Sequence, residues 1–214
     1  MAGVLFNNIP GNIRVSFFHA EFQPGGTPYQ QNARLLLVGQ KLSSGVAAAN
    51  IPLLATDSSI SSLAGTHSML EQMYRTARLN APLQEIWILP LADDGAGVAA
   101  TGKVSVNNTL PVSQAQALSL YIEGERIRIA VQTSDTRASV AAALVAAINA
   151  TPGLSVTAAV NGSNTYEVDL TARHKGAQGN AILIDVGVVS EDGPLGATLL
   201  TITAMANGAA DPDL

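Results

Sequence analysis

The chain of 214 residues contains no cysteine, and only 13% of its residues are charged. The absence of cysteine excludes disulfide bridges, thiolate metal sites and cysteine nucleophiles, and it is neutral on the cellular compartment. Eleven Lys and Arg stand against 16 Asp and Glu, for a formal net charge of −5. No run of basic residues forms a stripe that could neutralise phosphates, so we expect no nucleic-acid partner.

The sequence also lacks a targeting signal, because residues 1–14 contain no basic region followed by an apolar run. The longest uncharged stretch, 193–210, contains Pro194 and alternates at its centre, which indicates a strand and a turn. We therefore expect no membrane partner. Since hydrophobic residues make up 47% of the chain and charged ones only 13%, Ala, Ser, Thr and Gly must cover much of its surface. That composition suits a protein whose faces are buried against copies of itself.

Residues 1–32 are expected to form an extended arm. Ile13, Val15 and Phe17 fall on one side of an extended chain, with Arg14 and Ser16 on the other. The turn-forming PGGTP sequence at 24–28 then separates this segment from the first core strand.

Residues 33–96 are expected to form a βαβ unit. The apolar runs RLLLVGQ (34–40) and EIWILPL (85–91) are typical of strands buried on both faces. Between them, residues 65–82 have helical spacing, with Thr66 or Ser68 as the N-cap and Pro82 as the stop. A strand, a helix and a strand in this order favour parallel pairing within an α/β layer.

Residues 97–207 are expected to form a mostly antiparallel, β-rich domain with one helix. Alternating apolar residues on both sides of Glu123-Gly124 predict a hairpin over 119–132. A helix over 133–153 would be capped by Asp135 or Thr136. Further strands are expected at 154–160, 165–172, 181–189 and 197–205. Together with the preceding unit, this predicts an α+β fold.

The loop RHKGAQGN at 173–180 has the basic residues and glycines of a phosphate-binding loop, but not their order. In a P-loop the lysine follows the second glycine at a helix start, whereas Lys175 precedes Gly176 here. Apolar residues alternate before and after the loop. We therefore interpret Gly176, Gly179 and Asn180 as a turn that joins two strands of one sheet.

Candidates for catalysis are few. The three histidines, His19, His67 and His174, lie in different segments and show no metal-binding spacing, and no nucleophile elbow is present. Asp93 and Asp94 follow a buried strand, where α/β proteins often bind ligands, but a solvated turn is the better interpretation. The helix start at 65–68 could offer amides to an anion, although ordinary capping is again favoured. We expect no catalytic residue, no metal site and no cofactor.

Several short stretches, taken in order along the chain, resemble the Mu-like group of contractile-phage tail sheath proteins. They are NNIPGNIRV (7–15), GGTPYQ (25–30), ARLLLVGQ (33–40), GTHSMLEQM (65–73), KGAQGN (175–180) and ANGAADPDL (206–214). The resemblance implies that 33–96 is an incomplete α/β piece, the first part of a core domain that is subtilisin-like in topology, without a protease triad. It further implies that 97–207 is an inserted β-rich domain and that 208–214 returns to the core, where the chain ends as a truncated, N-terminal portion.

The function implied by the resemblance is that of a structural subunit, not an enzyme. Such subunits polymerise around the tail tube and contract to drive it through the host envelope. The implied partners are other sheath subunits, the tube protein, and the baseplate and tail terminator proteins, in the virion tail and, during assembly, in the host cytoplasm. Ile13, Val15 and Phe17 would insert into a neighbour's sheet as the arm that links subunits.

Two other classes stay open from the sequence. A ligand- or surface-binding β domain of another phage tail component would account for residues 98–207 alone, and a glycan-binding assay would separate it from a sheath. A hydrolase that uses the α/β piece would show turnover of ester or peptide substrates.

We predict that residues 1–22 become ordered only through a partner. The arm carries several apolar side chains, and an unpaired edge strand tends to pair with another chain. Amide hydrogen exchange in dilute monomer should therefore be fast through residues 12–18. Strong protection there in a demonstrably monomeric sample would show that the arm packs on its own domain.

Overall fold

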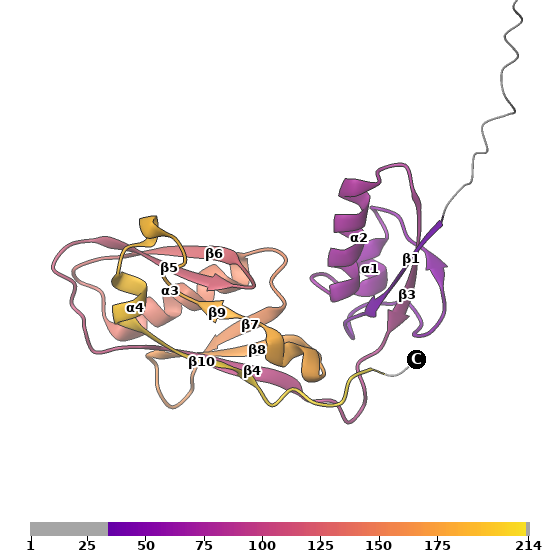
Figure 1. Cartoon of the computed structure of the whole chain (residues 1–214). Helices are drawn as coiled ribbons and strands as arrows, with labels where there is room; N and C mark the ends of the chain where they lie inside the picture. Colours follow the sequence, from indigo (N-terminus) through magenta and orange to yellow (C-terminus); the bar gives the residue numbers. More distant parts are fainter. Residues whose placement is uncertain (1–33, 213–214) are drawn as a thin grey trace, which may run out of the picture. The chain divides into compact units, whose positions relative to one another are not determined.

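The computed structural model describes residues 34–212 (Figure 1). Strands β1 (Arg34–Gln40), β3 (Glu85–Leu91) and β2 (Leu53–Leu54) form a sheet in the order β1-β3-β2. β1 and β3 pair in parallel, as the sequence predicts, and β2 pairs antiparallel with β3. The short strand β2 was not foreseen, and it makes the sheet mixed.

Helices α1 (Ile60–Ala64) and α2 (Met69–Asn80) pack against this sheet. The N-cap of α2 is Ser68, whose hydroxyl oxygen accepts a hydrogen bond from the Glu71 N–H at 3.1 Å. Leu70 and Tyr74 lie four residues apart on the buried face of α2 and pack with Ile86 and Ile88 of β3. The predicted helix is thus confirmed, with Ser68 as its cap, whereas α1 was not predicted.

Four antiparallel strands form the second sheet, in the order β10-β4-β8-β7. They are β10 (Leu200–Ala206), β4 (Ala99–Val106), β8 (Glu167–Lys175) and β7 (Val156–Val160). The third sheet contains β6 (Glu125–Val131), β5 (Gln116–Ile122) and β9 (Ile184–Asp185), in that order. Glu123 and Gly124 both have positive φ, 55° and 85°, at the β5–β6 turn. That geometry fits a two-residue hairpin and confirms the predicted one.

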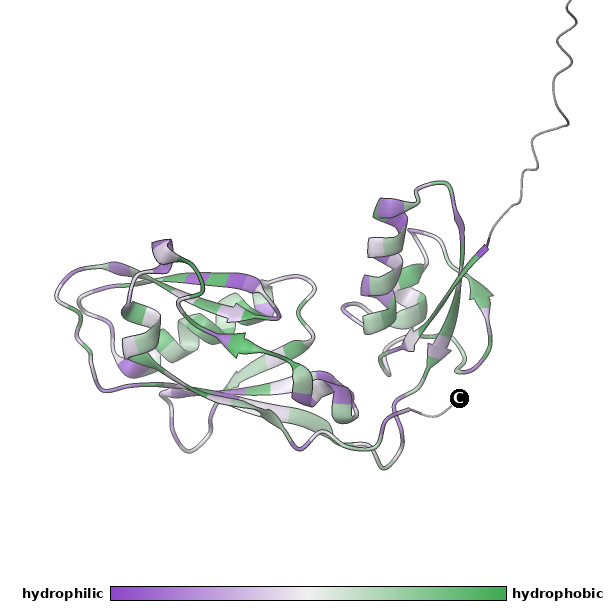
Figure 2. Cartoon of the chain, in the orientation of Figure 1, coloured by the Kyte–Doolittle hydropathy of each residue, from purple (hydrophilic) through white to green (hydrophobic). Residues whose placement is uncertain are grey.

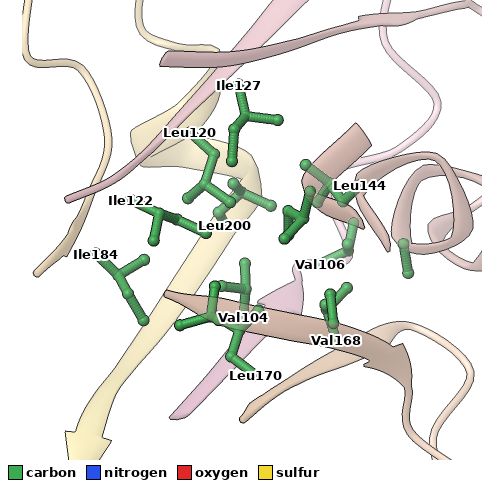
Figure 3. Close-up of a cluster of buried hydrophobic side chains, with 14 of the residues drawn as sticks. Val104, Val106, Leu120, Ile122, Ile127, Leu144, Val168, Leu170, Ile184 and Leu200 are labelled. Atoms are coloured by element: carbon green, nitrogen blue, oxygen red, sulfur yellow. The ribbon is translucent and has the colours of Figure 1, made fainter. Parts of the chain in front are cut away.

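Helix α3 (Arg137–Ala150) contacts strands of both the second and the third sheet. Its N-cap Thr136 and Ser139 form a reciprocal capping box. Val140, Leu144 and Ile148 are buried at the spacing of one helix face. Figure 3 shows Leu144 of α3 among side chains from both sheets, including Leu120 and Val168. These side chains form the larger of the two hydrophobic clusters.

The sequence underestimated the helical content of this second part. A short helix, α4 (Leu195–Leu199), precedes β10, although strand was expected from residue 197. Two 3₁₀ turns, η1 (Ala177–Ala181) and η2 (Ser190–Asp192), flank β9. Strand β4 was not predicted, because Gly102 and Lys103 interrupt its apolar pattern. The α+β class itself is confirmed.

No sheet runs from the first part into the second within residues 34–212. Each part has its own hydrophobic cluster. The chain from Arg34 onward nevertheless forms one compact unit, so polar contacts between the two clusters matter for its organisation. The domain bounds 33–96 and 97–207 stay a prediction.

Replacing Leu144 by alanine should lower the free energy of unfolding by about 2–5 kcal/mol, because the side chain is fully buried and its loss leaves a cavity. Urea unfolding followed by circular dichroism measures this change. Leu83→Ala is the matched control: the side chain is 99% exposed, and its truncation should change the free energy by no more than about 0.5 kcal/mol. Equal effects of the two substitutions would contradict the described core.

Candidate functional site

Several residues singled out separately in the sequence lie together at one polar junction. Asp93 follows β3, His174 and Lys175 end β8, and Met69 begins α2. Gln40, the last residue of β1, completes the group. We call these five residues the junction.

His174 is the centre of the junction. It is 7% exposed, because side chains alternate in β8 and its own points inward. The Met69 N–H donates a hydrogen bond to Nε2 of His174 at 2.9 Å. Nδ1 of His174 lies 3.3 Å from Oδ1 of Asp93. Because Nε2 accepts, the ring hydrogen is on Nδ1, and it donates to Asp93.

Asp93 and Gln40 extend these contacts to the backbone of β8. The Gln40 amide nitrogen donates to Oδ1 of Asp93 at 3.0 Å and to the Lys175 carbonyl oxygen at 2.9 Å. The Lys175 N–H donates to Oδ2 of Asp93 at 3.2 Å. The Asp93 carboxylate therefore accepts from three groups, which fixes the segment after β3 against the end of β8.

The junction favours neutral His174. Burial lowers the pKa of His174 below its ordinary value of 6.5, against the opposing charge of Asp93, and nearby Arg173 adds to the lowering. Since Nε2 already accepts the Met69 N–H, its lone pair is not free to take a proton from a substrate in this arrangement. Ser68 is likewise engaged as the cap of α2. The junction thus has the geometry of a structural contact between elements and not that of a general base with its nucleophile.

A second carboxylate close by supports the start of α2. Burial alone would raise the pKa of Glu71, but hydrogen bonds from Ser61, Arg75 and the His67 N–H hold it below its ordinary value. The Ser61 hydroxyl donates to Oε1 at 2.6 Å, and the guanidinium of Arg75 donates to the same atom. His67 itself has a positive φ of 65°, and its Nδ1 accepts from the Gly153 N–H at 3.4 Å. The start of α2 is therefore held by side chains from several directions.

The loop at 173–180 follows the junction directly, and its glycines are required by local geometry. Gly176 has φ 120°, and a Cβ on buried Gly179 would lie 2.8 Å from Cβ of Ala100. Asn180 exchanges two hydrogen bonds with the Gly208 backbone, at 2.9 and 2.7 Å. The residues lie between β8 and β9, but these strands belong to different sheets. The expectation of one sheet is wrong, because alternation alone does not specify which sheet a strand joins.

The amides of Gly176 and Ala177 in this loop already have acceptors within the chain. The Gly176 N–H donates to the Val98 carbonyl oxygen at 3.1 Å. The Ala177 N–H donates to Oδ1 of Asp211 at 2.6 Å. A carboxylate thus occupies the position that an anion would need. This arrangement supports a structural turn rather than a phosphate cradle.

A surface that was not predicted lies on the first sheet. Helices α1 and α2 cover the face that carries Leu35, Leu37, Ile86 and Ile88. The opposite face, which we call the open face, has no covering element among the described residues. It consists of Leu36, Val38, Leu54, Trp87 and Leu89.

The open face is apolar and accessible. Leu36 is 51% exposed and Val38 40%, which corrects the expectation that this strand is buried on both faces. Trp87 pairs with Leu36 on one side and with Leu54 on the other, so the three form a row across the sheet. Figure 2 shows β1 and β3 mostly in the hydrophobic colour. The uniformly apolar runs at 34–40 and 85–91 were the sequence signal for this second apolar face.

The remaining questions raised by the sequence concern metal binding, membrane spans and the arm. Within residues 34–212, no group of three His, Asp or Glu side chains could hold a metal ion. None of the helices described is long and apolar enough to cross a membrane. Ile13, Val15 and Phe17 lie outside the described residues, as does His19.

Comparison with known proteins supports the family resemblance. No protein-family model matches the chain. A curated protein of Haemophilus influenzae, the Mu-like prophage FluMu tail sheath protein, is 33% identical over 99% of this chain. The match covers 43% of that relative, so this chain spans less than half of the relative's length. The predicted similarity to a Mu-like tail sheath protein is thereby confirmed.

Inorganic phosphate should cause no saturable chemical-shift change at Lys175, Gly176 or Ala177 in an NMR titration. The reason is that the amides of Gly176 and Ala177 are already bonded and Asp211 repels an anion. Chloride at matched ionic strength serves as the control. A phosphate-specific, saturable shift confined to this loop would restore the phosphate-binding interpretation.

Proposed function

We propose that this chain is a structural subunit of a contractile phage tail sheath, which polymerises around the tail tube and contracts to drive it through the host envelope. The observation that carries the proposal is the 33% identity to a Mu-like prophage tail sheath protein over 99% of the chain. Because the similarity covers nearly the whole chain, it includes both of the parts that carry a hydrophobic cluster. The place of action would be the virion tail, after assembly in the host cytoplasm.

The open face supports a role in assembly. Sheets with parallel strands are normally covered on both faces, because their strands are apolar on both sides. An exposed row such as Leu36, Trp87 and Leu54 is typical of a surface that binds another protein. Arg34 and Glu85 lie next to this face, at one end of β1 and β3, and form an ion pair with each other at 3.2 Å. The remaining apolar part would be buried against another sheath subunit.

The edge of β1 supports the same role. β1 is the outer strand of its sheet, and none of the described residues pairs with its free edge. An edge strand binds an added strand through main-chain hydrogen bonds. Alternate side chains of the added strand then lie on the same face of the sheet. In our proposal an arm from a neighbouring copy adds here, and Ile13, Val15 and Phe17 extend the open face. The tube, baseplate and terminator proteins would be further partners of the assembled sheath.

The junction supports a non-enzymatic role. Its histidine has both ring nitrogens engaged, with Met69 and Asp93. The hydrolase alternative would need a histidine that can exchange a proton with substrate. No cofactor is required for the proposed function.

The chain should associate with itself in a concentration-dependent way, and the open face should become buried. The only tryptophan of the chain, Trp87, lies on that face and reports its burial as a shift of emission to shorter wavelength. Leu36→Lys should weaken association at least about tenfold, or 1.4 kcal/mol, because it places a charge in an apolar contact. Sedimentation velocity combined with Trp87 fluorescence measures both effects, and electron microscopy shows the shape of the particles.

Leu83→Lys is the matched control, because this leucine is 99% exposed and lies outside the sheet. It should leave both association and the Trp87 emission unchanged. The proposal predicts regular rings or tubes. A chain that stays monomeric, forms only amorphous aggregates, or responds equally to both substitutions would contradict it.

A further inference from the structure

The hydrogen bond from Met69 to His174 joins residues 105 positions apart. The first N–H groups of a helix have no acceptor within the helix and need one from outside. Ser68 caps Glu71 from within the same segment. The amide of Met69, in contrast, is capped by a side chain from β8, in the other part of the chain. His174 therefore couples the start of α2 to the second sheet.

This cap exists only while His174 is neutral. A proton added to Nε2 would remove the lone pair and place an N–H opposite the Met69 N–H. It would also place a positive charge at the N-terminus of α2, where the helix dipole is itself positive. Both effects act against the contact with Met69, whereas the contact with Asp93 would become an ion pair.

Some charged groups around His174 favour its protonated form and others favour its neutral form. Asp93, after β3, favours the protonated ring, and Arg173, next to His174 in β8, disfavours it. Lys175 follows in β8, and its ammonium group lies 3.5 Å from the Asp94 carbonyl oxygen. Glu71 belongs to α2, His67 precedes the cap of that helix, and Glu123 lies in the β5–β6 turn. Glu71 is engaged with Ser61 and Arg75, and Glu123 with the Ser155 N–H at 3.1 Å.

A cavity of about 120 Å³ beside the ring gives it room to respond. Met69, Gln72, Glu123 and His174 are among the residues that line it. Nε2 of Gln72, one of these lining residues, is buried without a hydrogen-bond partner. A tightly packed histidine would be held in place by its surroundings, but this one borders a partly polar space large enough for several water molecules.

We propose that His174 is a proton-operated latch, which caps α2 through Met69 when neutral and releases that helix start when protonated, while Asp93 keeps its hold on the end of β8. Acid would thus loosen one of two connections. The segment after β3 would act as a pivot, and α2 with the sheet it covers would gain freedom relative to β8. In a subunit whose parts must move during assembly, such a contact allows a change of arrangement without unfolding either hydrophobic cluster.

The sign of the pH effect follows from the lowered pKa of His174. Below its ordinary value of about 6.5, the released state takes up a proton more readily than the latched state. The latched state is therefore fully favoured above that value and loses its advantage as the pH falls through the lowered pKa. Neutral solution holds the latch closed.

Amide hydrogen exchange of the whole chain, resolved by NMR, tests the proposal. After correction for intrinsic exchange rates, the Met69 amide should lose at least about tenfold protection as the pH falls from 7.5 to below the midpoint of the His174 ring titration. The midpoint should match the titration of the His174 ring measured in the same samples. The Lys175 amide, bonded to Asp93, should keep its protection within about threefold and is the internal control.

Two variants assign the effect. His174→Gln should make Met69 protection independent of pH. His67→Gln should leave the wild-type pH dependence in place, although His67 accepts a hydrogen bond from the Gly153 N–H. Unchanged Met69 protection in the wild-type chain would overturn the proposal, as would equal losses at Met69 and Lys175. If His174→Gln does not fold, the coincidence of the two wild-type midpoints decides, and a mismatch of more than about one pH unit overturns the latch.

Discussion

A pair of parallel apolar strands cannot bury both of its faces with one layer of helices, and much of this chain's organisation depends on that constraint. β1 and β3 carry large apolar side chains on both sides. Helices α1 and α2 bury one side in a closed cluster around Ile86 and Tyr74. The other side is left as the open face. Burial of this face against another subunit would be favourable, because it removes apolar surface from water.

The second part of the chain does not share that requirement. Its two antiparallel sheets enclose their apolar sides against each other and against α3, as Figure 3 shows. The outer side of the four-stranded sheet carries polar pairs such as Lys103 with Glu167, at 2.8 Å. The second part thus buries its main apolar sides within itself, whereas the open face of the first sheet has no covering element among the described residues. This difference is what supports our proposal that the open face is a contact between subunits.

Local patterns in the sequence predicted the features that local physics determines. The helix cap, expected at Thr66 or Ser68 and found at Ser68, the helix that begins after it and the turn at Glu123-Gly124 depend on neighbours in sequence, and all three are present. β4 was missed, since Gly102 and Lys103 weaken its pattern, although pairing with β8 and β10 on both sides holds it in the sheet. The sheet to which β9 belongs was also wrongly expected, because Ile184 pairs with Ile122, far away in the sequence.

The candidate site shows the same division. Asp93, His174 and the start of α2 could each be singled out from the sequence. Their contact could not be predicted, because it joins residues up to 105 positions apart. The ends of β3 and β8 belong to separate sheets, and they meet through the contacts of Asp93 with His174 and Lys175. The open face was present in the sequence as two uniformly apolar runs, whose natural interpretation was burial on both sides. The sequence could not tell that the second side is free within residues 34–212.

The central claim is that this chain builds a sheath and that the open face is one of its contacts. Electron cryo-microscopy of assembled particles tests it most directly. The account predicts a tubular or ring-shaped assembly in which a neighbouring subunit covers Leu36, Val38 and Trp87 and an added strand pairs with the outer edge of β1. An ordered assembly that leaves this face and this edge in solvent would contradict it.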